Sequence, residues 1–379
     1  MIEPAAARAA WIERLALSDV RTYERLRLDL TRGVTVLVGR NGVGKTNLLE
    51  ACAVVLSGTS PRTSSELRLI REHADAARIA ATVRIGEDTH ERSVVLHRGR
   101  GKQLRADDGP VRSVAEFAAS VPVVTFLPER LLVIRGAPQR RRALVDGLAA
   151  HVIPGAGAAL RDYTHALQQR NALLRRAKIG HDVAAALEPW TAQLVTHGHA
   201  VRGARRRLLE LLAAPYAARF RQIVDTGQDE PTFVAELRGT EDLAADAAAH
   251  AELERRRGST LIGPHLDDLL PRLGGRDLRA FGSAGEQRTA LLAFTLAARD
   301  LLATHTGIEP VVLLDEPWSE LDSERRRRLT RLLAPLAQVV VTSTEPPAHL
   351  LQELPDARVL RVSSGTVAPW DDETTTTVR

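Results

Sequence analysis

Residues 39–46 have the types and the spacing of a loop that binds phosphate. They match the pattern G-x-x-x-x-G-K-T, in which the glycines let consecutive backbone N–H groups point at phosphate oxygens. The start of the helix that follows such a loop adds partial positive charge. In this pattern Lys45 reaches the β- and γ-phosphates, and the Thr46 hydroxyl is a ligand of Mg²⁺. The sequence therefore predicts a site for ATP and Mg²⁺ made of Gly39, Arg40, Asn41, Gly42, Val43, Gly44, Lys45 and Thr46.

The segments on either side of this loop are those that a phosphate-binding loop requires. The apolar run 34–38 precedes it and predicts a strand, and the run 47–56 follows it and predicts a helix. This order of strand, loop and helix turns a text match into a candidate site. The alternative is a glycine-rich turn that binds nothing.

Two consecutive acids follow a second apolar run, at 310–314. Asp315 is predicted to hold Mg²⁺, directly or through water, and Glu316 to orient and polarise the attacking water. Acids at strand ends are common, so the pair is informative only together with the phosphate-binding loop. The two motifs together predict ATP hydrolysis, with Lys45 and Glu316 as the catalytic residues.

A third stretch, 283–288, lies immediately before a helical run. Ser283 and Glu286 have the spacing of a capping box, which predicts that Ser283 caps this helix. The order of this stretch, the acid pair and a Ser-x-x-Asp loop is that of ABC-type ATPases. In such proteins the positive end of the capped helix faces the γ-phosphate held by another subunit, so ATP joins two heads. We therefore expect an ATP-dependent homodimer, with signature residues Ser283, Gly285, Glu286 and Gln287 acting in trans and D-loop residues Ser319 and Asp322.

The composition is that of a globular chain, with 44% hydrophobic and 26% charged residues. No apolar run approaches the ~20 residues that a membrane-spanning helix needs, and no signal peptide is apparent. The single cysteine, Cys52, cannot form an internal disulfide. A cytoplasmic protein without a membrane partner is expected.

The net charge of +5 permits a nucleic-acid partner. The chain has only three lysines, at 45, 102 and 178, so arginine replaces lysine throughout. Arginine clusters are then weak evidence for DNA contact, and solvated helix faces are the alternative that we favour for them. These clusters are 140–142, 205–207, 255–257 and 325–328.

Periodicity predicts strands before residue 128 and helices in the middle of the chain. Residues 25–30 alternate strictly, as half-buried strands do. Apolar residues recur at steps of three and four within 160–174 and 187–211, with Gly180 between. This spacing predicts a short antiparallel helical arm, or two helices of an ordinary helical lobe. The predicted domains are an N-terminal extension (1–13), an ATPase lobe in two parts (14–135 and 258–364), a helical lobe (136–257) and a disordered tail (365–379).

The motifs together resemble the RecF family of bacterial recombination mediators. The segments that carry the resemblance, in order, are GRNGVGKTNLLEAC, FLPERLLVIRGAPQRRRALVD, YTHALQQRNALL, GSTLIGPHLDD, GSAGEQRTALL and LLDEPWSELD. The resemblance implies an α/β fold, a P-loop ABC-type ATPase head with a mixed sheet and flanking helices, joined to a helical second lobe with a short arm. It also implies slow ATP hydrolysis as a switch, DNA binding at single-strand gaps, and partnership with RecR in loading RecA. Related heads place a basic residue near the nucleotide at the position of Arg21.

Some residues depart from the family pattern. Leu266 replaces the usual arginine after Gly-Pro-His, Pro317 and Trp318 follow the acid pair, and Ser343 stands where many ABC proteins have a histidine. The alternatives are the ATPase subunit of another DNA-repair or transport system, a structural tether of the SMC or Rad50 kind, and a clamp that turns ATP over very slowly. Ser283 follows Lys45 by 238 residues, which argues against a transporter subunit, and the absence of a long coil argues against a tether.

Overall fold

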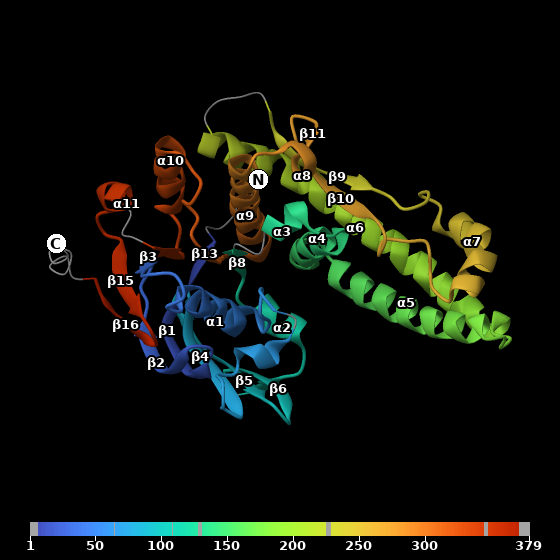
Figure 1. Cartoon of the computed structure of the whole chain (residues 1–379), viewed down its shortest axis with the longest axis horizontal. Helices are drawn as coiled ribbons and strands as arrows, with labels where there is room; N and C mark the ends of the chain where they lie inside the picture. The colour runs from blue at the N-terminus through green and yellow to red at the C-terminus, as the bar shows by residue number, and fades with distance from the viewer. Residues whose placement is uncertain are drawn as a thin grey trace. The chain divides into compact units, whose positions relative to one another are not determined.

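The computed structural model describes residues 7–63, 65–107, 109–127, 131–224, 229–344 and 348–370. The chain forms two compact units (Figure 1). The head unit consists of Met1–Arg130, Arg219–Gly227 and Arg288–Arg379, and the helical unit of Leu131–Ala218 and Gln228–Gln287.

The head unit contains a six-stranded sheet that carries the motifs. Its order is β16-β15-β3-β14-β13-β8, and all neighbours are parallel except β15 and β16. The central strands are buried almost throughout, as parallel strands covered on both faces are. Because the carboxyl ends of parallel strands share one edge, the residues after β3 and β13 meet there. The strands are β3 (Gly33–Val38), β8 (Val123–Phe126), β13 (Val311–Leu314), β14 (Gln338–Ser343), β15 (Arg358–Ser363) and β16 (Thr366–Pro369).

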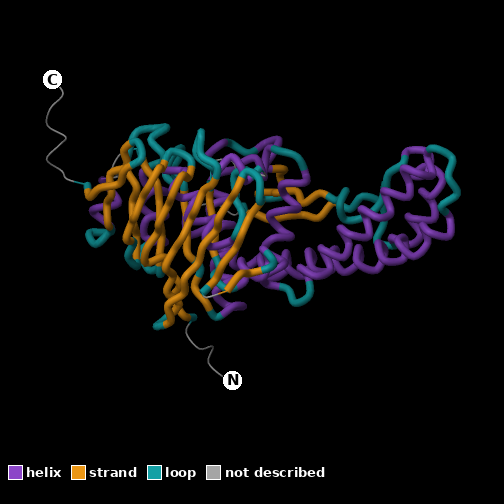
Figure 2. The backbone as a smooth tube through the Cα atoms, turned by 90° about the horizontal axis from the view of Figure 1, so that it is seen from below, coloured by secondary structure: helices purple, strands orange, loops and turns teal. Residues whose placement is uncertain are grey.

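A second, seven-stranded sheet of the head unit follows the order β12-β1-β4-β5-β6-β7, with β2 also paired to β1. All of its pairs are antiparallel except that of β1 and β12. Figure 2 shows the strands in orange. The strands are β1 (Arg8–Val20), β2 (Tyr23–Asp29), β4 (Ala76–Ile85), β5 (Asp88–His97), β6 (Gly101–Ala106), β7 (Gly109–Val111) and β12 (Ile308–Glu309).

Helix α1 (Lys45–Ser57) contacts strands of both sheets. Ten of its residues are buried, which explains why the run after the phosphate-binding loop is apolar all round. The packing holds the start of α1 at the edge where β3 and β13 end. The other elements of the head unit are η1 (Glu66–Leu69), α2 (Val114–Ala119), α10 (Ser323–Leu333) and α11 (Ala348–Glu353).

The helical unit is built on helices α5 and α6. The Arg170 guanidinium donates to Thr191 Oγ1 at 3.0 Å, and a Cβ on Gly198 would lie 3.4 Å from the Tyr163 ring, so the two helices are antiparallel. The predicted arm is confirmed, because buried residues of both helices, between Tyr163 and Val201, form one core together with α7. The elements are α3 (Leu131–Arg135), α4 (Pro138–Val152), α5 (Ala156–Lys178), α6 (Ala184–Val224), β9 (Pro231–Glu236), α7 (Leu243–Arg257), β10 (Asp268–Leu273), β11 (Arg276–Asp277), α8 (Leu278–Phe281) and α9 (Ala284–Thr306), of which α6 and α9 extend into the head unit.

Two expectations about the ends of the chain were wrong. Strand β1 starts at Arg8 and pairs with β12 and β4, so residues 8–13 of the expected extension belong to the sheet. Residues 366–369 of the expected disordered tail form β16, which pairs with β15; residues 371–379 lie outside the described part of the chain. Backbone pairing decides both cases, and short segments of ordinary composition do not reveal it. The predicted internal boundaries at 135 and 257 differ from the observed division into units, because residues 131–135 and 258–287 belong to the helical unit.

Within the part of the chain that the structure describes, no helix combines the length and the apolar character needed to cross a bilayer.

Candidate nucleotide-binding site

The phosphate-binding loop joins β3 to α1 through backbone conformations that require glycine. Gly42 and Gly44 have φ angles of 82° and 110°. A Cβ on Gly44 would lie 2.7 Å from the Thr22 hydroxyl oxygen, and the Tyr23 hydroxyl donates to the Gly44 carbonyl at 3.0 Å. A side chain at Gly44 would therefore be strained by its φ angle and would also clash with the β1–β2 turn.

Lys45 is buried and folds back over the loop. Its Nζ donates to the carbonyls of Gly39 at 2.6 Å and Arg40 at 3.2 Å. Nζ also lies 3.5 Å from Glu316 Oε1. The ammonium group thus donates to two carbonyls of the loop and forms an ion pair with Glu316.

Thr46 and Asp315 meet at the shared edge of the parallel strands. Thr46 Oγ1 donates to Asp315 Oδ2 at 2.8 Å, and the Thr342 hydroxyl donates to the other carboxylate oxygen, Oδ1. A hydroxyl beside a carboxylate is the oxygen donor pair that Mg²⁺ accepts when phosphate and water complete its shell. Among the described residues, no group of three His, Cys, Asp or Glu side chains could hold a metal alone.

Glu316 has an unusual backbone and a carboxylate in poor solvation. Its φ is 49°, its N–H donates to Thr342 Oγ1 at 3.0 Å, and its carbonyl accepts from the Ser319 hydroxyl at 3.0 Å and from the Arg288 guanidinium. Its Oε1 is buried and accepts no hydrogen bond from the described residues. Burial raises the pKa of Glu316; Lys45 opposes that rise, and the neighbouring Asp315 adds to it. A carboxyl group with a raised pKa beside the phosphate-binding loop is suited to accept a proton.

Sequence reasoning assigned no role to Arg288 or Thr342, which both hold Glu316. Arg288 is buried, and its guanidinium lies 5.2 Å from the centre of the Phe126 ring and donates to the Glu316 carbonyl. Burial lowers the pKa of Arg288, and the acids Glu316, Asp315 and the nearby Glu320 oppose that change. The signal available for Arg288 was its position directly after the capping stretch.

The predicted capping box is confirmed in the helical unit. The Glu286 N–H donates to Ser283 Oγ at 3.2 Å, and the Ser283 N–H donates to Glu286 Oε2 at 2.8 Å. Ser283 itself is exposed, while Gln287 is buried and donates to the Leu278 carbonyl at 2.7 Å. Gln287 therefore fixes the turn before α9, whereas Ser283 and the half-buried Gly285 stand at the accessible start of this helix.

The two D-loop residues have separate structural roles. The Ser319 hydroxyl donates to the Glu316 carbonyl, and Asp322 caps α10 by accepting from the Arg325 N–H at 2.9 Å. The loop is thus tied to Glu316 at one end and to a helix at the other.

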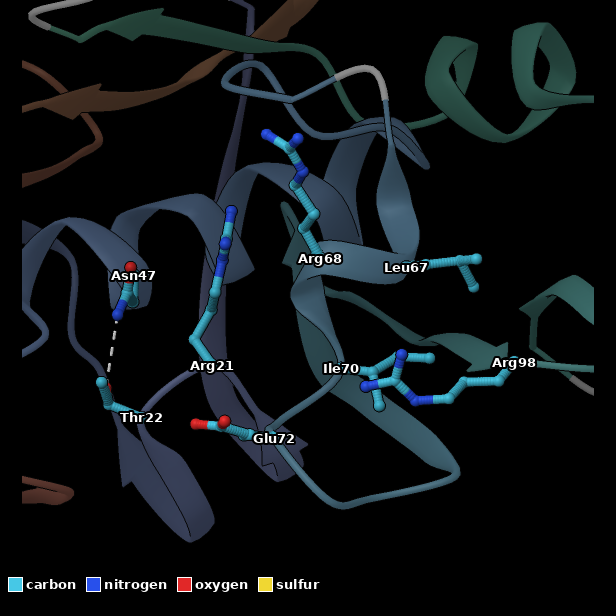
Figure 3. Close-up of a pocket in the computed structure, with 8 residues that line it drawn as sticks. All are labelled: Arg21, Thr22, Asn47, Leu67, Arg68, Ile70, Glu72 and Arg98. Atoms are coloured by element: carbon cyan, nitrogen blue, oxygen red, sulfur yellow. Dashed lines mark hydrogen bonds between the residues drawn. The ribbon is translucent and has the colours of Figure 1, made fainter.

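Arg21 lies at the wall of an open pocket of about 500 Å³ beside the start of α1 (Figure 3). Its guanidinium makes two hydrogen bonds of 3.1 Å to the fully buried Glu50, which Arg62 also contacts at 3.1 Å. On one side of the pocket Asn47 donates to Thr22 Oγ1 at 3.3 Å. The size is that of a small-molecule pocket. The lining residues are Arg21, Thr22, Asn47, Leu67, Arg68, Ile70, Glu72 and Arg98; of these, sequence reasoning named only Arg21 as a binding residue.

The chain is similar to proteins of known families over nearly its whole length. The family described as "RecF/RecN/SMC N terminal domain" matches residues 11–353. The protein named "DNA replication and repair protein RecF" from Synechococcus sp. (strain JA-3-3Ab) is 33% identical over 373 residues, which are 95% of this chain and 98% of that protein. The protein of the same name from Frankia alni is 36% identical over 361 residues, 89% of this chain and 95% of that protein.

Solved structures agree at the level of the fold. The structure described as the recombination mediator protein RecF with ATP superposes with a TM-score of 0.86 at 24% identity, covering 97% of this chain and 99% of that one. An Smc head domain from Pyrococcus furiosus superposes with a TM-score of 0.56 at 17% identity, covering 95% of each chain. The fold is therefore the α/β head shared by RecF and Smc proteins. On the sequence relationships, which extend over nearly the full length of its relatives, the chain belongs to the RecF family.

Proposed function

We propose that this chain is an ATP-dependent, DNA-binding recombination mediator that acts at single-strand gaps in DNA repair and replication. One observation carries the ATP part of the proposal: Lys45, Thr46, Asp315 and Glu316 converge although the two pairs are far apart in the sequence. The relationship to RecF proteins supports the role in repair. It also favours repair over a transport system, because the similarity extends over nearly the whole chain.

Each residue of the site has a distinct role in this proposal. Lys45 binds the β- and γ-phosphates, and the loop N–H groups surround their oxygens. Thr46 and Asp315 would hold Mg²⁺, which supplies charge to the γ-phosphate when bound. Glu316 orients water and accepts its proton. The pocket beside Arg21 and Asn47 would receive the nucleoside part of ATP, since it opens next to the first turn of α1.

The pairing of Lys45 with Glu316 suggests how ATP acts as a switch. The Lys45 ammonium lies 3.5 Å from the Glu316 carboxylate. A γ-phosphate competes for the same ammonium, which releases Glu316 to bind water. Hydrolysis then requires that ATP first break the contact between Lys45 and Glu316. Turnover is slow when the released carboxylate is rarely aligned with water.

We further propose that ATP joins two copies of the chain. The start of α9 carries an exposed Ser283 and a partial positive charge, which suits a γ-phosphate held by a second head. RecR and, through it, RecA are the proposed partners of the dimer on DNA, by relationship to the family.

Sizing by multi-angle light scattering would test the proposal. The chain should be monomeric alone and dimeric with ATP and Mg²⁺. The dimer should stay bound longer to a duplex that contains a single-strand gap than to an intact duplex. A mass that stays unchanged with ATP would contradict the shared site. Equal retention on intact duplex would contradict the preference for gaps, and RecR added to the gapped complex should comigrate with it.

A further inference from the structure

The arginine clusters of the chain differ in whether nearby carboxylates form ion pairs with them. In the helical unit Arg141, Arg202 and Arg205 are buried and bound to Asp268, Asp267 and Asp146, respectively. These residues hold the unit together and are not available to a partner.

The arginines on α10 are exposed to different degrees, but most of them form ion pairs with carboxylates. Arg327 and Arg328 contact Glu324, and Arg331 contacts Glu353 at 2.8 Å. Carboxylates at this distance remove most of the attraction that these arginines could offer to an outside anion.

The far end of the helical arm is different. We define the arm tip as residues 175–182 and 255–258, where α5 and α7 end. The segments contain six Lys or Arg residues and a single acid, Asp182. Arg175, Arg176, Lys178 and Arg257 are exposed, and none has a carboxylate partner among the described residues.

Buried contacts hold the two helix ends together. The Arg170 guanidinium binds Glu254 at 2.7 Å, and both side chains are almost fully buried. Next to this pair, Asn171 Oδ1 accepts from the Thr260 N–H at 2.7 Å. At the tip, a Cβ on Gly258 would lie 3.1 Å from Lys178 Cδ, so the end of α5 lies directly beside the residue that follows α7. Figure 1 shows the ends of α5 and α7 next to each other.

We propose that the arm tip binds the phosphate backbone of DNA. The carboxyl ends of both helices carry partial negative charge, which explains one cation at each end but not an excess of exposed, unpaired ones on two helices. Unpaired arginine and lysine side chains on a rigid support fit a row of phosphates, and they give affinity without reading the base sequence. This inference rests on the proposed DNA-binding function and assigns a surface to it.

An acidic protein surface is the alternative partner. A substitution of the exposed Ile179 distinguishes a protein partner from DNA. Ile179, in segment 175–182 of the tip, is 74% exposed. A protein interface would bury such an apolar side chain and draw energy from it, whereas phosphate contacts do not need it.

The test compares matched variants of the full-length chain on one fluorescent gapped duplex by anisotropy. The tip variant is Arg175→Gln/Arg176→Gln/Lys178→Gln/Arg257→Gln. The control is Arg206→Gln/Arg207→Gln/Arg327→Gln/Arg331→Gln, which removes the same charge from exposed residues that each have a carboxylate partner. Thermal unfolding and ATP affinity should be unchanged in both, since all eight side chains are exposed.

The tip variant should lose affinity by about ten-fold or more, and the slope of log K against log salt should fall by about one for each phosphate that the variant no longer neutralises. The control should lose at most a few-fold, and Ile179→Ala should bind like the wild type. Equal losses in tip and control variants would overturn the proposal, because net charge would then explain binding. A loss in Ile179→Ala as large as that of the tip variant would indicate a protein-type surface and would also overturn it.

The outcomes separate this inference from the proposed function. If the wild type binds gapped DNA and the tip variant binds equally well, only the arm tip is excluded. If the wild type does not bind DNA at any salt concentration, both the arm tip and the DNA-binding function are excluded.

Discussion

Thr46 Oγ1 donates a hydrogen bond of 2.8 Å to Asp315 Oδ2, although the two residues are 269 positions apart. Thr46 lies in the first turn of α1 and Asp315 follows β13, so the bond joins the phosphate-binding loop to the acid pair. The parallel arrangement of β3, β14 and β13 places both residues at the same edge.

Thr342 is predicted to position both acids through its hydroxyl. Thr342→Val removes the donor to Asp315 and leaves the Glu316 N–H without its acceptor, so the free energy of unfolding should fall by about 1–3 kcal/mol. Hydrolysis under single turnover should fall by about ten-fold, with ATP affinity changed far less, because only the acids move. Thr342→Ser keeps the hydroxyl and should restore the rate.

Thr35 offers a matched control for this prediction. It is fully buried in neighbouring strand β3, and its hydroxyl has no hydrogen-bond partner among the described residues. Thr35→Val should therefore leave hydrolysis unchanged and should not destabilise the chain. If Thr35→Val and Thr342→Val reduce the rate equally, packing and not the hydrogen bonds would explain the effect.

Glu316 is predicted to make hydrolysis depend on pH. Its raised pKa means that acidification protonates it at a higher pH than an ordinary glutamate, whose pKa is about 4.3. The rate with saturating ATP should therefore fall while ordinary glutamates are still ionised. Glu316→Gln should abolish this dependence by removing most of the activity, while ATP binding and dimerisation persist. A Glu316→Gln chain that cannot bind ATP would indicate a structural or metal-binding role instead.

The same pKa shift predicts a change of stability with a defined sign. Because the folded-state pKa exceeds the unfolded one, the folded chain binds more protons between the two values, and stability decreases as pH rises through that window. Without ATP, Glu316→Gln should thus melt at a higher temperature than the wild type at pH 8, and the difference should shrink at lower pH.

Arg288 is predicted to transmit the position of α9 to the catalytic acid. Arg288→Lys keeps the charge but loses the planar group that lies over Phe126 and donates to the Glu316 carbonyl. We expect kcat to fall several-fold with little change in KM, since ATP contacts are intact. Arg331→Lys, at an exposed ion pair with Glu353, is the control and should have wild-type kinetics. A rise in KM alone would contradict the positioning role.

Mixing two inactive variants tests whether the site is shared between subunits. Lys45→Ala should fail to bind ATP. Ser283→Arg should bind ATP but fail to dimerise, because it places a bulky cation where the start of α9 must approach phosphate. In a mixed dimer, one site combines the intact loop of the Ser283 variant with the intact α9 of the Lys45 variant. Mixing should therefore restore part of the ATP-dependent association, measured by light scattering.

Two results would contradict a shared site. No recovery at any mixing ratio would mean that each chain completes its own site. Full activity of Ser283→Arg alone would remove α9 from the chemistry altogether, whichever way the chains associate.

The sequence alone determined the features that depend on short stretches of chain. The loop 39–46 specifies its own geometry through glycines at positive φ, and Ser283 and Glu286 cap α9 through atoms three residues apart. The apolar spacing within 160–211 was sufficient to predict the arm. The order of the motifs was sufficient to identify the family.

Only the tertiary structure decided which distant side chains meet. The contacts of Thr342 and Arg288 with Glu316 join residues 26 and 28 positions apart on separate elements, and no local pattern marks them. Arg257 and Lys178 have no carboxylate partner in the described part of the chain, and this likewise depends on where the carboxylates of the helical unit lie. Charge and hydrogen-bond pairing are properties of positions in space, so similar arginine clusters became a buried framework in one place and an exposed cationic surface in another.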